Sequence, residues 1–183
     1  MKRVLRLTQW LLGASAAVLL GYWCYDSAES RLFQGRELDQ LSQRSDATKT
    51  VPMAGGLIGR IDIPRLEVSV AVMEGSGAAI LRHAAGHIEG TALPGQPGNV
   101  GISAHRDTFF RPLRNIRQDD LITVTTTLST YRYRVVSTRI VLPTNVGVLD
   151  AGTAQVLTLV TCYPFWFVGT APDRFIVRAE RVI

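Results

Sequence analysis

Residues 155–162 read QVLTLVTC, a run of apolar and β-branched residues that is typical of a buried β-strand. Tyr163 and Pro164 follow directly, and a proline cannot donate a hydrogen bond to a strand ladder. The strand is therefore expected to end here. This ending places the thiol of Cys162 at the end of a strand.

Six further runs of this kind lie beyond residue 55, and Gly, Pro and Asn turns separate them. Two stretches between them, 76–83 and 107–116, lack strand alternation and are expected to be helical, the first with Ser76 as its N-cap. Many short strands in one domain predict a mostly antiparallel barrel or sandwich. The predicted strands are 56–63, 68–73, 99–104, 121–127, 131–142, 155–162 and 174–183.

The composition bounds the function classes. A chain of 183 residues has the size of one domain, and 46% hydrophobic with 19% charged residues excludes a disordered protein. The only cysteines are Cys24 and Cys162, too few for a disulfide framework or a cysteine-based zinc cluster. The net charge is +5, but the arginines are scattered singly along the chain, so we expect no nucleic-acid partner.

The amino-terminal segment favours a membrane anchor. Leu7 to Tyr25 contains nineteen residues without a charge, enough for about 29 Å of helix. Lys2, Arg3 and Arg6 precede it, and Asp26 follows it. The positive-inside rule then predicts a single-pass helix in the cell membrane, with a cytoplasmic N-terminus and an extracytoplasmic bulk. A cleaved signal peptide is the alternative interpretation.

Three regions follow from these patterns. Residues 1–26 form the basic flank and the predicted transmembrane anchor. Residues 27–55 are polar and lack a sustained apolar run, which indicates a stalk or a loosely packed helix. Residues 56–183 form the folded domain that carries the candidate site.

Cys162 and His105 are the first candidates for chemistry. Cys162 alone is more often a small buried hydrophobe, but a lone thiol outside the cytoplasm risks oxidation, and Cys24 lies in the predicted anchor. His105 follows an apolar strand and could move protons, or it could be a surface residue in a turn. His83 and His87 fit turn or capping roles better.

Arg174 is the third candidate, at the start of the last predicted strand, where it could stabilise a developing oxyanion. Arg178 lies on the same face of that strand, and an edge-strand charge against aggregation is the alternative role for either arginine. Together, one Cys, one His and one Arg at strand ends form a possible set for acyl transfer. A free thiol holds only a few per cent of thiolate at neutral pH, and a nearby imidazolium raises that fraction.

These residues carry a family resemblance. The pentapeptide TLVTC at 158–162 resembles the TLxTC signature of sortases, the membrane-anchored cysteine transpeptidases of bacteria. The segment AHRD at 104–107 is similar to the sortase His region, and RFIV at 174–177 resembles the stretch with the family's Arg. The resemblance covers 56–183, and the segments 86–95 and 105–110 are most similar to class D and related single-sortase proteins.

The resemblance implies a mostly β fold, the sortase-type closed β-barrel of about eight strands with short helices. It implies that Cys162, His105 and Arg174 are catalytic, and that Thr161 and Ala104 line the substrate groove. The Cys162 thiolate would attack the Thr–Gly bond of an LPxTG-like sorting signal at the C-terminus of a secreted protein, and His105 would protonate the leaving amine. An amine on a cell-wall precursor or on another protein would then take the acyl group, with no cofactor.

Other readings remain open beside this one. A noncatalytic, membrane-tethered barrel that binds peptide would keep Cys162 as a core residue. A thiol redox protein is disfavoured because no C-x-x-C motif occurs. The stalk has no Asp-Pro-aromatic motif, which disfavours a pilus-building role. We expect no metal site, since a carboxylate cluster cannot be assembled from the sequence at Glu67, Glu74, Asp119 and Asp120.

Overall fold

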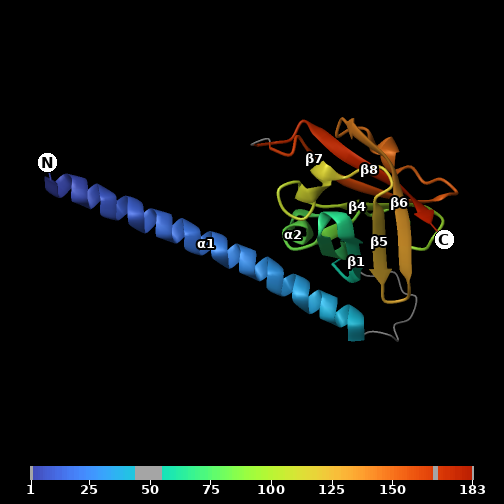
Figure 1. The fold of residues 1–183 in the computed structure, drawn as a ribbon, viewed down its shortest axis with the longest axis horizontal. Helices are drawn as coiled ribbons and strands as arrows, with labels where there is room; N and C mark the ends of the chain where they lie inside the picture. The colour runs from blue at the N-terminus through green and yellow to red at the C-terminus, as the bar shows by residue number, and fades with distance from the viewer. Residues whose placement is uncertain (1, 44–54, 167–168, 183) are drawn as a thin grey trace.

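A long helix leads into a closed β-barrel in the computed structural model, which describes residues 2–43, 55–166 and 169–182 (Figure 1). The helix α1 (Lys2–Gln43) extends away from the barrel, and all eight strands belong to the barrel. The predicted fold class, mostly β with short helices, is confirmed. The strands are β1 (Leu57–Ile63), β2 (Val68–Glu74), β3 (Ala85–His87), β4 (Gly98–Ser103), β5 (Leu121–Thr126), β6 (Thr130–Val141), β7 (Gln155–Tyr163) and β8 (Asp173–Val182).

The strands close in the order β1-β2-β3-β4-β7-β8-β6-β5, with β5 paired back onto β1. Alternate residues on each strand face inward, and large buried side chains such as Ile61, Leu157 and Tyr133 fill the interior. Because the barrel is closed, every strand has a hydrogen-bonded neighbouring strand on both sides. The edge-strand role considered for Arg174 is therefore wrong, because β8 lies between β7 and β6.

The expectation of a mostly antiparallel arrangement is confirmed, since six of the eight described strand pairs are antiparallel and two are parallel. β2 and β3 are parallel, and so are β4 and β7. β3 itself is absent from the sequence prediction, because its three residues Ala85, Gly86 and His87 carry little β propensity. The parallel pairing of β4 with β7 matters most here, since it brings the ends of these two strands to the same rim of the barrel.

The predicted helical stretches are shorter in the structure. The first reduces to α2 (Ala78–Leu81), whose N-cap is Gly77 rather than Ser76. The second contains only the 3-10 helix η2 (Arg111–Asn115), where Pro112 stands in the first turn. Two more 3-10 helices, η1 (Pro64–Leu66) and η3 (Val146–Leu149), form the β1–β2 connection and part of the β6–β7 connection.

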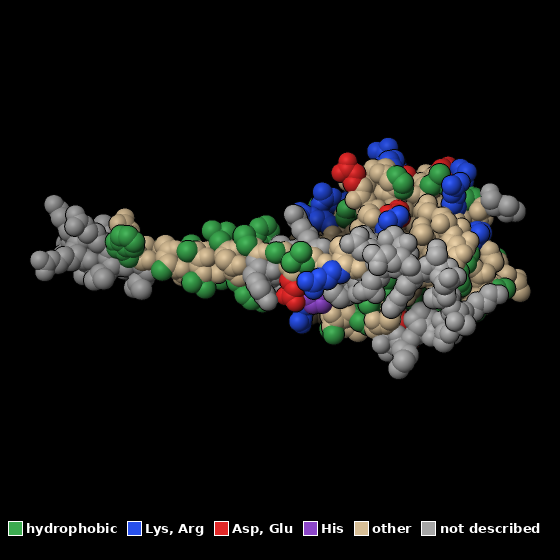
Figure 2. Space-filling model, turned by 90° about the horizontal axis from the view of Figure 1, so that it is seen from below, with side chains coloured by type: hydrophobic (Ala, Val, Ile, Leu, Met, Phe, Trp, Pro, Cys, Tyr) green, Lys and Arg blue, Asp and Glu red, His purple; other side chains and the backbone are tan. Residues whose placement is uncertain are grey.

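The predicted transmembrane segment lies within α1, and its described apolar side chains are exposed, including those of Trp10, Val18 and Trp23. Green apolar groups appear along this helix in Figure 2. However, none of the helices in the described ranges is long and apolar enough to cross a membrane. The predicted membrane span is thus not supported, and the polar residues Thr8 and Gln9 lower the apolar content of the segment.

The side chain of Gln34 forms hydrogen bonds between α1 and the barrel. Its Nε2 donates a 2.5 Å hydrogen bond to the carbonyl oxygen of His83, and its Oε1 accepts one of 2.6 Å from the amide of Ala71 on β2. A polar residue in the predicted stalk region therefore joins the helix to the β2 side of the barrel.

Candidate active site

Cys162 and Arg174 are direct neighbours across the β7–β8 pair. The antiparallel register sets Cys162, near the end of β7, opposite Arg174, near the start of β8. Opposed residues in such a pair share one face of the sheet, with Cβ atoms about 4.5–5.5 Å apart. Both residues are partly exposed. A thiol and a permanently charged guanidinium thus face the same side of the barrel.

The Arg174 side chain is held by the turn that precedes it. Its Nη1 donates to the carbonyl oxygen of Asp173 at 3.0 Å and to that of Ala171 at 3.4 Å. Both bonds use one nitrogen of the guanidinium group, which carries five N–H donors in a rigid fork. Within the described part of the chain Arg174 forms no ion pair, so its remaining donors can serve a reacting oxygen.

His105 reaches the same region from the other side of β7. The β4–β7 register pairs Ser103 with Val160, and the amide of Ala104 donates to the carbonyl oxygen of Val160 at 3.3 Å. The last residue pair of this register is Ser103 and Val160, and His105 and Cys162 each follow two residues later in the chain. The imidazole of His105 is exposed, in a turn closed by a 3.1 Å bond from the amide of Phe110 to the His105 carbonyl oxygen.

Thr161 and Ala104 connect the two catalytic candidates. The Thr161 hydroxyl donates to the carbonyl oxygen of Ala104 at 2.8 Å, and both residues are buried. Their predicted contact with substrate stays a prediction, because the described contacts of Thr161 are with the protein itself. The contacts support a positioning role, since this bond joins the residue before Cys162 to the residue before His105.

Arg106 is a site residue that the sequence reasoning missed. Its guanidinium donates 3.0 Å hydrogen bonds to the carbonyl oxygens of Pro164 and Gly169, on the β7–β8 connection. It therefore attaches the turn that carries His105 to the loop between Cys162 and Arg174. Its position directly after His105 was the only feature of the sequence that could have suggested a role at the site. An arginine that binds backbone carbonyl groups has no recognisable sequence pattern, because every residue has a carbonyl group.

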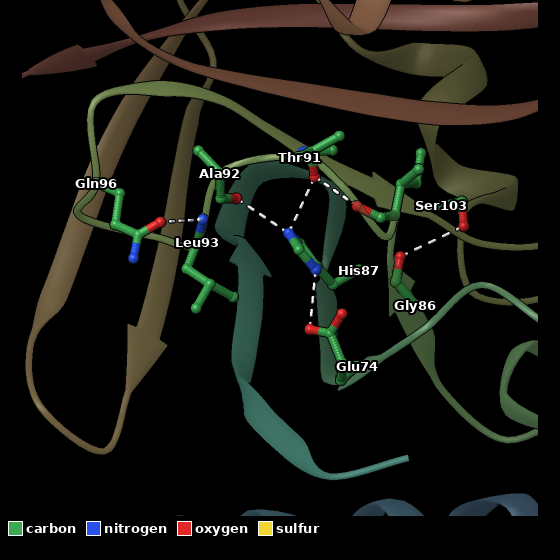
Figure 3. Close-up of polar contacts among 10 residues, drawn as sticks. Glu74, Gly86, His87, Thr91, Ala92, Leu93, Gln96 and Ser103 are labelled. Carbon is green, nitrogen blue, oxygen red and sulfur yellow. Dashed lines mark hydrogen bonds and ion pairs between the residues drawn. The ribbon is translucent and has the colours of Figure 1, made fainter. Parts of the chain in front are cut away.

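The other two histidines lie elsewhere. His87 is 2% exposed, and its Nδ1 lies 2.9 Å from Oε2 of Glu74 (Figure 3). Its Nε2 lies 3.0 Å from both the Ala92 carbonyl oxygen and the Thr91 hydroxyl. His83 lies between α2 and β3, with its carbonyl group bonded to Gln34. His87 thus fixes the start of the β3–β4 connection.

The carboxylates once considered for a metal site have other partners. Asp120 is buried and accepts two 2.5 Å hydrogen bonds from the Arg65 guanidinium and one of 2.8 Å from the amide of Arg117. The hydrogen bonds from Arg65 lower the pKa of Asp120 below its ordinary value, against the opposing effect of burial. Glu74 is paired with His87. In the described ranges no three potential ligand residues gather as a metal site.

The protein is a closed mixed β-barrel whose rim carries a thiol, an imidazole and a guanidinium, the groups expected of a cysteine-dependent acyl-transfer enzyme. Comparison with protein-family models matches the Sortase domain over residues 61–182. This chain belongs to the sortase family, whose members are transpeptidases. The resemblance seen in the TLVTC and AHRD segments is confirmed at the level of the family.

Individual relatives agree with this assignment. The chain is 31% identical to sortase D of Bacillus subtilis (strain 168) over 132 residues, which cover 72% of this chain and 67% of the relative. It is 29% identical to sortase A of Streptococcus agalactiae serotype III (strain NEM316), covering 68% of this chain and 52% of that one. The chain thus spans about half the length of that sortase A.

Solved structures show the same fold. A Clostridium perfringens sortase D5 transpeptidase superposes with a TM-score of 0.73 at 26% identity, covering 82% of this chain and 98% of that one. Sortase A from Corynebacterium diphtheriae gives a TM-score of 0.65 at 30% identity, covering 69% and 61%. The closed eight-stranded barrel is therefore the sortase barrel.

Proposed function

We propose that this chain is a cysteine transpeptidase that cleaves an LPxTG-like sorting signal between Thr and Gly and transfers the acyl group to an amine. The observation that carries the proposal is the convergence at one rim: Cys162 opposite Arg174 across β7–β8, and His105 following β4 on the other side of β7. A thiol nucleophile, a proton carrier and a cation are the groups that acyl transfer needs.

The first half-reaction forms a thioester. The Cys162 thiolate attacks the carbonyl carbon of the Thr residue, and the carbonyl oxygen becomes an oxyanion that the Arg174 guanidinium stabilises. The C–N bond to Gly then breaks as the His105 imidazolium donates its proton to the departing amine. The acyl part of the sorting signal stays on the sulfur of Cys162.

The second half-reaction transfers the acyl group. An amine attacks the thioester carbon, its proton passes to His105, and the C–S bond breaks to restore the Cys162 thiolate. The acceptor amine belongs to a cell-wall precursor or to another protein, and water is a slow competitor. The scheme needs no cofactor, since the two half-reactions only exchange acyl and proton partners.

The proposal also places the catalytic barrel outside the cytoplasm at the cell membrane. The basic residues before the uncharged segment 7–25 and the exposed apolar side chains on α1 support this location. Protease added to intact spheroplasts should then degrade the barrel. Protection of the whole chain from the protease would contradict this location.

The function is tested by incubating the full chain with LPxTG-like peptides and amine donors. Cleavage between Thr and Gly, with an acyl adduct on Cys162 detected by mass spectrometry, would support the proposal. The alternative is a noncatalytic peptide-binding barrel, which would bind these peptides without an adduct. A Cys24→Ala background keeps the exposed second thiol out of the measurement.

A further inference from the structure

A pocket of about 400 Å³ lies on the outer face of the barrel beside the candidate active site. Strands β6, β7 and β8 form its base, with Ile176 and Thr158 in the lining, and η3 contributes Gly147 and Val148. Thr158 precedes Cys162 by four residues on β7, which corresponds to about 13 Å along the strand. The pocket is therefore within reach of a short extended peptide whose scissile bond lies at Cys162.

Two arginines line this pocket, Arg139 from β6 and Arg178 from β8. The β6–β8 register pairs Arg139 with Ile176, so Arg178 is its diagonal neighbour on the same face, about 7–8 Å away. The register shifts between Val135 and Ser137. Without that shift, strict alternation from the buried Val135 would turn Arg139 into the core.

The positive charge of this pair is not neutralised locally. Within the described ranges, neither Arg139 nor Arg178 forms an ion pair. The nearest acidic side chain of β8 on this face, Glu180, lies opposite Arg134 and Val156, further from Cys162 than Arg178. Asp150 follows η3 and forms no ion pair with either arginine. Two guanidinium groups beside a pocket therefore present unused donors to an anion.

Buried hydrogen bonds hold the pocket in shape. Asn99 on β4 is 2% exposed, and its Nδ2 donates to the carbonyl oxygen of Val148 at 3.0 Å. Its Oδ1 accepts a 2.7 Å bond from the hydroxyl of Thr158. One buried amide thus joins the η3 wall to the base of the pocket, which is preorganised before any ligand arrives.

The geometry also indicates which part of the substrate enters the pocket. Both the leaving amine and the entering amine must meet His105, which follows β4 on one side of β7. The pocket extends from β7 toward β8 and β6, on the other side. The acyl part of the peptide, which stays on Cys162 through both half-reactions, is therefore the part that extends along the pocket.

We propose that the Arg139–Arg178 pocket binds an acidic side chain of the acyl-donor peptide, at the residue directly before the LPxT-like motif. This inference rests on the proposed function and specifies its substrate. An extended peptide rises about 3.3 Å per residue, so four residues before the reacting Thr match the distance from Cys162 to Thr158. A Glu carboxylate there accepts hydrogen bonds from one or both guanidinium groups.

Paired peptides test this subsite in the full chain. They carry Glu or Gln directly before the motif, and kcat/KM is measured for each. We expect a Glu preference of about tenfold for the unmodified chain, a modest value because the pocket is partly open to solvent. The ratio should fall toward one in Arg139→Gln and in Arg178→Gln, and it should fall with added salt. Arg132→Gln, an exposed arginine elsewhere on β6, should keep the full ratio.

A binding measurement separates this subsite from the transpeptidase proposal. The Cys162→Ala chain is titrated with fluorescent versions of the two peptides, which needs no turnover. Tighter binding of the Glu peptide, lost in Arg178→Gln, supports the pocket even if no peptide is cleaved. Three outcomes would overturn the subsite: cleavage of both peptides at equal kcat/KM, equal or absent binding of the two peptides, or a preference for an acidic residue only after the scissile bond. The transpeptidase proposal would then still be tested separately, by the acyl adduct on Cys162.

Discussion

The hydroxyl group of Thr161 donates a 2.8 Å hydrogen bond to the carbonyl oxygen of Ala104, and these residues directly precede Cys162 and His105. The bond crosses from β7 to the chain that leaves β4, two strands that are parallel neighbours. It is buried, so its loss leaves an acceptor without a partner. The relative position of the candidate nucleophile and proton carrier therefore depends on one side chain behind them.

Replacing this hydroxyl should affect both stability and rate. Thr161→Val keeps the volume but leaves the Ala104 carbonyl group unsatisfied, at a cost of about 1–3 kcal/mol in the free energy of unfolding. The acylation rate, measured at equal folded fraction, should also fall about tenfold because the two groups shift. Thr161→Ser retains the donor and should recover most of the rate. Equal rates for Val and the unmodified chain would show that the bond is only structural.

Cys162→Ala should abolish both cleavage and thioester formation while the barrel still folds, because the partly exposed side chain adds little to the core. The measurements are peptide cleavage, adduct mass and the unfolding temperature. Loss of folding instead would favour the interpretation of Cys162 as a core residue.

The three histidines should behave differently. His105→Ala should remove turnover without a large change in stability, since its imidazole is exposed. His87→Ala should lower the unfolding temperature, because the partly buried Glu74 loses its partner, yet the folded fraction should keep much of its turnover. His83→Ala should also retain much of the turnover. Single-turnover rates corrected for folded fraction check these outcomes, and equal losses at all three positions would undo the assignment.

Arg174→Ala should slow acylation by a hundredfold or more, on the order of 3 kcal/mol of transition-state stabilisation. Arg174→Lys should recover little, because an ammonium group lacks the planar fork of donors. Arg178→Ala should slow acylation of a neutral peptide less, since its position on β8 is opposite Thr158 rather than Cys162. A larger loss for Arg178→Ala, measured by single-turnover acylation, would refute the role given to Arg174.

The Arg65–Asp120 pair predicts a pH dependence of stability. The lowered pKa of Asp120 means that the folded chain binds its proton less readily than the unfolded chain. The stabilisation is therefore complete above the ordinary carboxyl range and is lost as pH falls through the folded pKa. Asp120→Asn should lower the unfolding temperature at pH 7, and the difference should narrow toward about pH 3.

Asp119→Asn is the matched control, because Asp119 is exposed and lies 3.8 Å from Arg134. It should change the unfolding temperature little at either pH. Thermal unfolding followed by circular dichroism across this pH range checks both variants. A difference for Asp120→Asn that stays constant with pH would contradict the role of its charge.

Several strands can be predicted from local residue types. The run QVLTLVTC, the proline after Tyr163 and the apolar stretch before His105 predict their strands locally, because β-branched residues and prolines act on their own backbone. The TLVTC and AHRD motifs led to the family for the same reason, since they are contiguous. The membrane span over Leu7 to Tyr25, by contrast, was predicted from the length of the uncharged segment and from the charges that flank it, and the structure does not support it.

Other features of the fold depend on residues that are distant in the chain, and local residue types do not predict them. The residues of β3 have low β propensity, and this strand forms because β2 and β4 supply its hydrogen-bond partners. The bulge after Val135 turns Arg139 outward to join Arg178, and alternation along the sequence cannot show such a register shift. Arg106 and Thr161 act through carbonyl groups, which every residue carries. The carbonyl groups that they bind are therefore determined by the path of the chain in the folded barrel, and residue types do not predict them.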